Sequence, residues 1–160
     1  MAPRFPEPEW FLALGRLMAA RGELFRRIGY ADTRFVARVL PDEEGGDAQR
    51  NIASADVAIA NIGISMTGYA LSRAEALAPA AAASFDPDFT ICARESVWRR
   101  MLDEIARHGR PELRHTLNSL VLMGEEMWLE SADQLREDKF YRFNQTLQEF
   151  FNLAAQLPAD

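Results

Sequence analysis

The chain has 160 residues, of which 48% are hydrophobic and 26% are charged, and its formal net charge is −6. This length and composition predict one globular domain over residues 1–160 rather than a disordered chain. A nucleic-acid-binding protein needs a basic face to neutralise phosphates, and no basic run occurs here, so we expect no nucleic-acid partner.

Cysteine usage and the absence of targeting patterns favour a cytoplasmic protein. Cys92 is the only cysteine, which excludes an internal disulfide and fits a reducing compartment. No apolar run reaches the ~18 residues that a membrane-spanning helix needs, and the N-terminus lacks the pattern of a secretory signal. We therefore expect no stable membrane insertion. Arginine makes up all but one of the 18 basic residues, a codon bias that favours a bacterial source.

The N-terminal half predicts an arm, a helix and several strands. Residues 1–8 contain three prolines and predict an extended arm, and a helix with an aromatic stripe follows as far as Arg21-Gly22. Alternation of apolar and polar residues at 35–39 predicts a half-buried strand. Further predictions, in chain order, are a weaker strand at 24–28, a loop at 40–47, an extended region at 55–69 with a bulge at 61–63, and a short helix with a connector at 74–84.

A strand and an amphipathic helix follow one another directly at 86–108. The strand Phe89–Ala93 comes after the turn pair Asp86-Pro87, and the helix begins at Glu95. On a helical wheel its apolar face holds Val97, Trp98, Met101, Leu102 and Ile105. Beyond it we predict a helix from Pro111 whose apolar face holds Leu113, Thr116, Leu117 and Leu120, a strand at 127–130 and a closing helix from about Asp133 to Gln156. Strands early and helices late favour the α+β class.

This order of elements resembles the sterol carrier protein type-2 family. The resemblance lies in Asp86-Pro87-Asp88-Phe89-Thr90-Ile91 leading into Val97-Trp98-Arg99-Arg100-Met101-Leu102, and it extends over residues 111–151. It implies a sheet of about five mainly antiparallel strands covered by helices. It also implies an apolar tunnel for sterols, fatty acids or acyl-CoA, with the closing helix as part of its wall or lid.

The closing helix carries the candidate ligand wall. Apolar pockets need apolar and aromatic surfaces with a few polar groups. The candidate residues are Phe140, Phe143, Asn144, Leu147, Phe150 and Phe151, facing Trp98, Met101 and Ile105 of the earlier helix. Asn144 falls within the apolar face. Its amide either bonds a neighbouring backbone group within the core or anchors a ligand head group.

The sequence contains no recognisable reaction centre. The common metal, dinucleotide, nucleophile-elbow and phosphate motifs are missing, so we predict no catalytic residue, metal or cofactor. Glu104 and His108 have a spacing that suits a metal, but Glu104 lies on the polar face of its helix. We predict structural roles for both, a solvated His115, turn or cap roles for Asp86 and Asp88, and a buried, inert Cys92.

Two functions remain open from the sequence. The first is non-catalytic binding or transfer of an apolar small molecule, such as a lipid, sterol or fatty acyl group, in an internal pocket. The second is a non-catalytic accessory or dimerising subunit that binds a partner protein, or a second copy, through the aromatic helix surface. An enzyme of lipid breakdown that uses Asp88, His115 or Tyr141 has no constellation of residues to support it.

Overall fold

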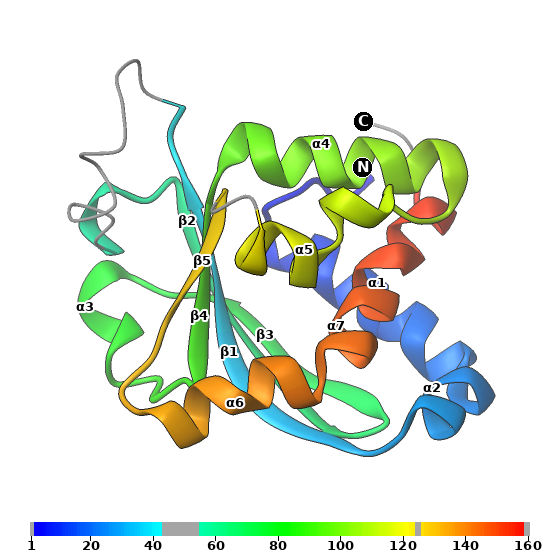
Figure 1. Ribbon diagram of the computed structural model, residues 1–160, viewed down its shortest axis with the longest axis horizontal. Helices are drawn as coiled ribbons and strands as arrows, with labels where there is room; N and C mark the ends of the chain where they lie inside the picture. The colour runs from blue at the N-terminus through cyan, green and yellow to red at the C-terminus, as the bar shows by residue number, and fades with distance from the viewer. Residues whose placement is uncertain (1, 43–54, 124–125, 159–160) are drawn as a thin grey trace.

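A five-stranded sheet with helices packed against it forms the protein, as the computed structural model shows for residues 2–42, 55–123 and 126–158 (Figure 1). The strands lie in the order β3-β2-β1-β4-β5. β1 pairs in parallel with β4, and the other three pairs are antiparallel. The predicted α+β class and mainly antiparallel sheet are therefore confirmed. The strands are β1 (Ala31–Leu40), β2 (Ala60–Gly68), β3 (Ala70–Ala76), β4 (Phe89–Arg94) and β5 (Met127–Glu130).

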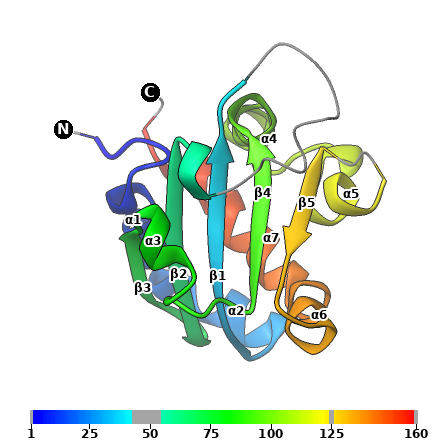
Figure 2. The same ribbon diagram turned by 90° about the vertical axis from the view of Figure 1, so that its left-hand side faces the viewer.

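The helices lie mainly on one face of the sheet. Figures 1 and 2 show α1, α4 and α7 on this face, whereas α3 lies on the other. The helices are α1 (Pro8–Ala20), α2 (Gly22–Ile28), α3 (Pro79–Ala82), α4 (Glu95–His108), α5 (Leu117–Leu122), α6 (Gln134–Arg142) and α7 (Asn144–Asn152), with 3₁₀ turns η2 (Ala55–Val57), η3 (Leu113–His115) and η4 (Leu153–Gln156). Among the described residues, no helix has both the length and the apolar character needed to cross a bilayer.

The core lies between the helices and one face of the sheet. Side chains of a strand alternate between its two faces, so every second residue of β1, β2 and β4 points into this core. They are Phe35, Ala37, Val39, Ile62, Ile64, Met66, Phe89, Ile91 and Ala93, all buried in one apolar cluster with residues of the helices.

Local sequence signals account for the elements that were predicted correctly. α1 begins at Pro8, where a missing N–H costs nothing, and α4 ends at Gly109, which adopts the left-handed conformation with φ 81°. α5 and α6 begin where the side chains of Thr116 and Asp133 accept hydrogen bonds from the backbone N–H groups of Ser119 and Arg136. The strands at 35–39, 89–93 and 127–130 also lie where predicted.

The predicted strand at 24–28 is wrong, because this segment forms helix α2. Arg21 ends α1, and α2 starts at the next residue, with only Phe25 fully buried. The predicted bulge at 61–63 is also wrong. The bulge was predicted because the apolar alternation at Val57 and Ile59 is out of phase with the alternation that follows, but these two residues precede the strand. The register of the sheet shifts instead between Ser65 and Met66 of β2, where it pairs with β3.

β3 was missed, and the short helix with a connector predicted at 74–84 is wrong in part, because residues 74–76 belong to this strand and only Pro79–Ala82 form helix α3. The alanines of residues 70–76 give this segment a low strand propensity. Pairing with β2 and contact with α1 select the strand, so tertiary context decides here. Of the loop predicted at 40–47, Leu40 belongs to β1 and residues 43–47 lie outside the described part of the chain. The arm predicted at 1–8 packs against the domain, since Phe5 is buried in the core.

The predicted closing helix is two helices. The backbone breaks at Phe143, where φ is −105° and ψ is 12°, and α7 begins at the next residue. The helix predicted from Pro111 is likewise divided into η3 and α5. Leu117 and Leu120 are buried as predicted, but Leu113 lies in the separate turn and faces solvent.

Candidate ligand-binding interior

The apolar face of α4 supplies one wall of the interior. Trp98, Met101 and Ile105 are fully buried, as the helical wheel predicts. A buried indole N–H needs an acceptor, and that of Trp98 donates to the backbone carbonyl of Arg38 on β1 at 3.1 Å. This bond sets the orientation of the largest buried ring of α4 against the sheet.

α7 supplies the facing wall. Leu147, Phe150 and Phe151 are fully buried, and the ring centroid of Phe151 lies 5.7 Å from that of Trp98 and 5.4 Å from that of Phe150. These distances are typical of aromatic pairs in contact. The fold therefore brings together the predicted residues of α4 and α7.

Three aromatic residues that the sequence analysis did not select complete this group. Phe11 and Trp10 of α1 lie 6.3 and 6.4 Å from the ring of Phe151, and Phe5 lies 5.9 Å from Trp98. The adjacent pair Trp10-Phe11 was a visible signal in the sequence, because the apolar helix face that carries these rings needs an apolar surface to pack against. Phe5 gave no such signal, since it lies among prolines.

Phe140 of α6 is buried in a different part of the same core. Its ring lies 5.7 Å from Phe89 of β4, which stacks on Phe35 of β1 at 5.4 Å. Together with the group around Phe151, this aromatic set forms one continuous apolar cluster beneath the helices.

Phe143 and Asn144 lie at the break between α6 and α7, and both are only half-buried. The break turns α7 relative to α6, so Asn144 does not lie where a continuous helical wheel places it. Its amide donates a 3.5 Å hydrogen bond to the carbonyl of Tyr141, in the last turn of α6. Of the two roles left open for Asn144, this contact matches the bond to a neighbouring backbone group.

A polar latch holds α6 to the sheet. Asp88, at the start of β4, accepts hydrogen bonds from the Thr33 hydroxyl at 2.9 Å, from the Arg34 backbone N–H at 3.0 Å and from the ammonium of Lys139 at 3.2 Å. Beside it, Arg136 of α6 pairs with Asp86. The acidic turn before β4 therefore attaches helix α6 to strand β1.

A buried carboxylate lies on the polar side of α4, contrary to the prediction of a polar face there. Glu104 is 7% exposed, pairs with Nδ1 of His115 at 2.6 Å and accepts a hydrogen bond from the Glu112 backbone N–H at 2.8 Å. The prediction of a solvated His115 is wrong for the same reason. A helical wheel of α4 alone could not reveal this pair, because His115 belongs to the segment after Pro111, which folds back beside α4.

The pKa of Glu104 follows from these contacts. Burial alone would raise it, but the Glu112 N–H, the bond to His115 and the charges of His115 and Arg100 together hold the pKa below its usual value of 4.5. Glu104, Glu112 and His115 each have an atom that can bind a metal ion, and these three atoms lie within 4.8 Å of one another. Because both oxygens of Glu104 already have partners, the arrangement is a clasp that fastens η3 to α4.

Cys92 is buried on the sheet face opposite the aromatic cluster, beside the guanidinium of Arg38. Burial, with a smaller effect of the Glu130 charge, raises the pKa of the thiol to about 12, and Arg38 opposes this only in part. The prediction of a buried thiol is confirmed, and a thiol with this pKa is a poor nucleophile.

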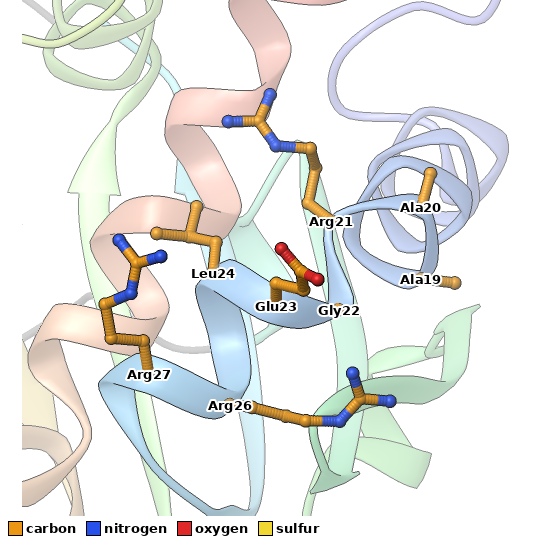
Figure 3. Close-up of a pocket in the computed structure, with 8 residues that line it drawn as sticks. All are labelled: Ala19, Ala20, Arg21, Gly22, Glu23, Leu24, Arg26 and Arg27. Atoms are coloured by element: carbon orange, nitrogen blue, oxygen red, sulfur yellow. The ribbon is translucent and has the colours of Figure 1, made fainter.

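The junction of α1 and α2 has a surface hollow of about 540 Å³ (Figure 3). It is lined by Ala19, Ala20, Arg21, Gly22, Glu23, Leu24, Arg26 and Arg27. None of these is a predicted ligand residue. The guanidinium groups of Arg21, Arg26 and Arg27 point in different directions, so they do not converge on one point in the hollow.

Comparison with known proteins identifies the fold of the chain. No family model and no curated protein sequence matches the chain. Among solved structures, a crystal structure of sterol carrier protein 2 aligns with a TM-score of 0.61 and 18% identity, over 94% of this chain and 96% of that one. The chain has the fold of sterol carrier protein 2. A solution structure from Thermus thermophilus, of a conserved hypothetical protein considered a candidate sterol carrier, aligns with a TM-score of 0.60 and 19% identity, over 100% of this chain and 93% of that one.

The fold of sterol carrier protein 2 confirms the resemblance stated from Asp86–Ile91 and Val97–Leu102. These residues form the turn before β4, the strand itself and the first half of α4. They matter to the fold because the turn holds the latch to α6, and α4 presents Trp98 to the interior.

Proposed function

We propose that this protein binds an apolar small molecule, such as a lipid, sterol or fatty acyl group, between the sheet and helices α4 and α7, without transforming it. The observation that carries the proposal is the contact between Trp98 and Phe151, which joins two aromatic helix faces over an apolar sheet face. The sterol carrier protein 2 fold supports it, because that structure's name states a carrier of sterols.

Binding would be driven by burial of the cargo. Each methylene removed from water contributes about 0.8 kcal/mol, so a long apolar body supplies most of the affinity. The rings around Phe151 contact one another, so cargo must separate α7 from α4 to enter. The break at Phe143 is the point where α7 can move while the latch at Asp88 keeps α6 in place.

Asp88 and His115, two of the residues that an enzyme of lipid breakdown would use, have different partners. Asp88 is engaged by Thr33, Arg34 and Lys139, whereas His115 is engaged by Glu104. These two sets share no member, so Asp88 and His115 belong to separate hydrogen-bonded groups.

The alternative, a partner protein bound through the aromatic helix surface, is less well supported. Phe140, Phe150 and Phe151 are fully buried within the chain itself. These rings therefore do not form an exposed surface for a partner, and the alternative lacks the support that the sterol carrier protein 2 fold gives to the carrier function.

Titration with a fluorescent long-chain fatty acid tests the proposal. We expect saturable binding with one site per chain, and an affinity change of several-fold in Phe151→Leu, whose smaller side chain reshapes the interior. Phe85→Leu is the matched control, because Phe85 is also buried but packs on the opposite sheet face beside Gly63. Absence of saturable binding, or equal effects of both substitutions, would contradict the proposal.

A further inference from the structure

One edge of the Arg100 guanidinium, on α4, is buried without a hydrogen-bond partner. Its Nε and Nη2 atoms are closed off from solvent, and no described residue accepts a hydrogen bond from either of them. Buried polar groups in folded proteins almost always have a partner, and a buried charged donor without one costs free energy. We call these two donors the Arg100 fork. The fork needs an acceptor that the described part of the chain does not supply.

The other edge of the same guanidinium is held in place. Its Nη1 atom pairs with the carboxylate of Glu126 at 3.1 Å, and Glu126 directly precedes β5. The Arg100 side chain as a whole is 37% exposed, whereas Nε and Nη2 are buried, so the fork is the edge turned away from solvent. A guanidinium that is already oriented loses little freedom when a ligand binds to its remaining edge.

The nearest carboxylate on α4 does not serve the fork. Glu104 lies four residues after Arg100, a spacing that places two side chains on the same face of a helix. The charge of Arg100 reaches it, because this charge contributes to the lowered pKa of Glu104. However, the oxygens of Glu104 accept from the Glu112 backbone N–H and pair with His115. The clasp therefore uses the Glu104 carboxylate and leaves the fork to another acceptor.

We infer that the Arg100 fork binds an oxyanion, either a carboxylate or a phosphate, through two parallel hydrogen bonds. Nε and Nη2 lie on one edge of the planar guanidinium, and their N–H groups match two oxygens of such an anion. Val97 and Met101, which flank Arg100 on the helix, are buried in the core, so the bound oxyanion lies beside the apolar interior.

The oxyanion has two possible sources with the same chemistry. One is a free anion from solution, and this source does not depend on the proposed function. The other is the head group of an apolar cargo, and this source rests on the proposed carrier function. In both cases Arg100 supplies the two donors and Glu126 keeps the guanidinium in place.

NMR of the arginine Nε–H groups of the full chain tests the inference, with the Arg100 signal assigned through Arg100→Lys. The probes are phosphate, acetate, decanoate and decanol, at an ionic strength held constant with sodium chloride. We expect a saturable shift of the Arg100 signal with the oxyanions and a much smaller one with decanol, which has the same tail as decanoate but no oxyanion. A free-anion site responds to acetate and decanoate alike, whereas a head-group site responds to decanoate at far lower concentration.

A substitution that keeps the charge provides the second measurement. Lysine has no planar fork, so Arg100→Lys should weaken oxyanion binding, measured by calorimetry, by about tenfold or more. Arg107→Lys makes the same change at an exposed position of α4 and should leave the affinity unchanged. No shift of the Arg100 signal, an equal shift with chloride or decanol, or equal oxyanion affinity of Arg100→Lys and the wild type would overturn the inference.

Decanol separates this result from the proposed carrier function. Its binding reports the apolar interior alone, so Arg100→Lys should retain it. Failure of the wild-type chain to bind decanol or decanoate would contradict the carrier function, while a saturable response of the Arg100 signal to phosphate would still support the oxyanion site. Decanol binding without any response to the oxyanions would do the reverse.

Discussion

The Cys92 thiol is the residue whose environment makes the simplest prediction. It is fully buried, and burial raises its pKa to about 12. Because only the thiolate reacts, we expect an aromatic disulfide reagent at mildly alkaline pH to modify the native protein no faster than the chain unfolds. Addition of denaturant should make the reaction immediate. Native protein that reacted as fast as free cysteine would contradict the described burial.

Glu104 predicts a specific dependence of stability on pH. Its pKa is lower in the folded protein than its ordinary value of 4.5, so its stabilising contribution is complete above that value and is lost as pH falls through the folded pKa. We expect Glu104→Gln to lower the free energy of unfolding by about 1–3 kcal/mol at neutral pH. The difference from the wild type should shrink below pH 4.5.

Urea unfolding of both proteins across this pH range checks the prediction. Asp103→Asn is a matched control, because it removes one carboxylate from the neighbouring, exposed position of α4. It should leave the free energy of unfolding nearly unchanged. A Glu104→Gln difference that stays constant down to strongly acidic pH would show that the clasp to His115 does not depend on the carboxylate charge.

At the scale of elements, the attachment of α6 depends on the latch at Asp88. Its carboxylate joins β1, β4 and α6 through Thr33, Arg34 and Lys139. We expect Asp88→Asn to accelerate amide hydrogen exchange in α6 and to lower the free energy of unfolding by about 1–3 kcal/mol, since all three hydrogen bonds reach one carboxylate oxygen and the substitution removes its negative charge. Asp32→Asn on β1, at an exposed position, should change neither quantity. Unchanged exchange in α6 after Asp88→Asn would rule the latch out.

The elements predicted correctly are those whose local signals and tertiary setting agree. α4 has a strongly one-sided apolar face and ends at a left-handed glycine, and β4 is bounded by a turn. β3 could not be predicted, because its alanines favour a helix and only pairing with β2 selects a strand. The break at Phe143 gave no signal either, since neither glycine nor proline marks it.

The candidate site residues also divide into those that a local pattern predicts and those that depend on tertiary contacts. Trp98, Phe150 and Phe151 were predicted from helical periodicity and lie together in the core. Asn144 was placed on the apolar face only because the helix was assumed to continue through residue 143. Phe5 contacts Trp98, far away in the chain, and Glu104 contacts His115 beyond the end of its own helix, so neither contact lies within one predicted element.

For the whole molecule, the aromatic group around Phe151 joins α1, α4 and α7. Removal of a buried phenylalanine ring leaves a cavity that the surrounding structure fills only in part, and Phe151→Ala should lower the free energy of unfolding by about 3–5 kcal/mol. Tyr69→Ala, at an exposed position, should cost far less. If the two substitutions had equal effects in urea unfolding, the Phe151 group would not be the centre of the core.

The central claim, that this interior accepts an apolar guest, is tested most directly by native mass spectrometry of protein purified from its own host, followed by organic extraction. We predict a mass increment that corresponds to one lipid, sterol or fatty acid per chain, recovered in the extract. A chain that carries no such molecule, and that acquires none when incubated with the lipids of its host, would contradict the claim.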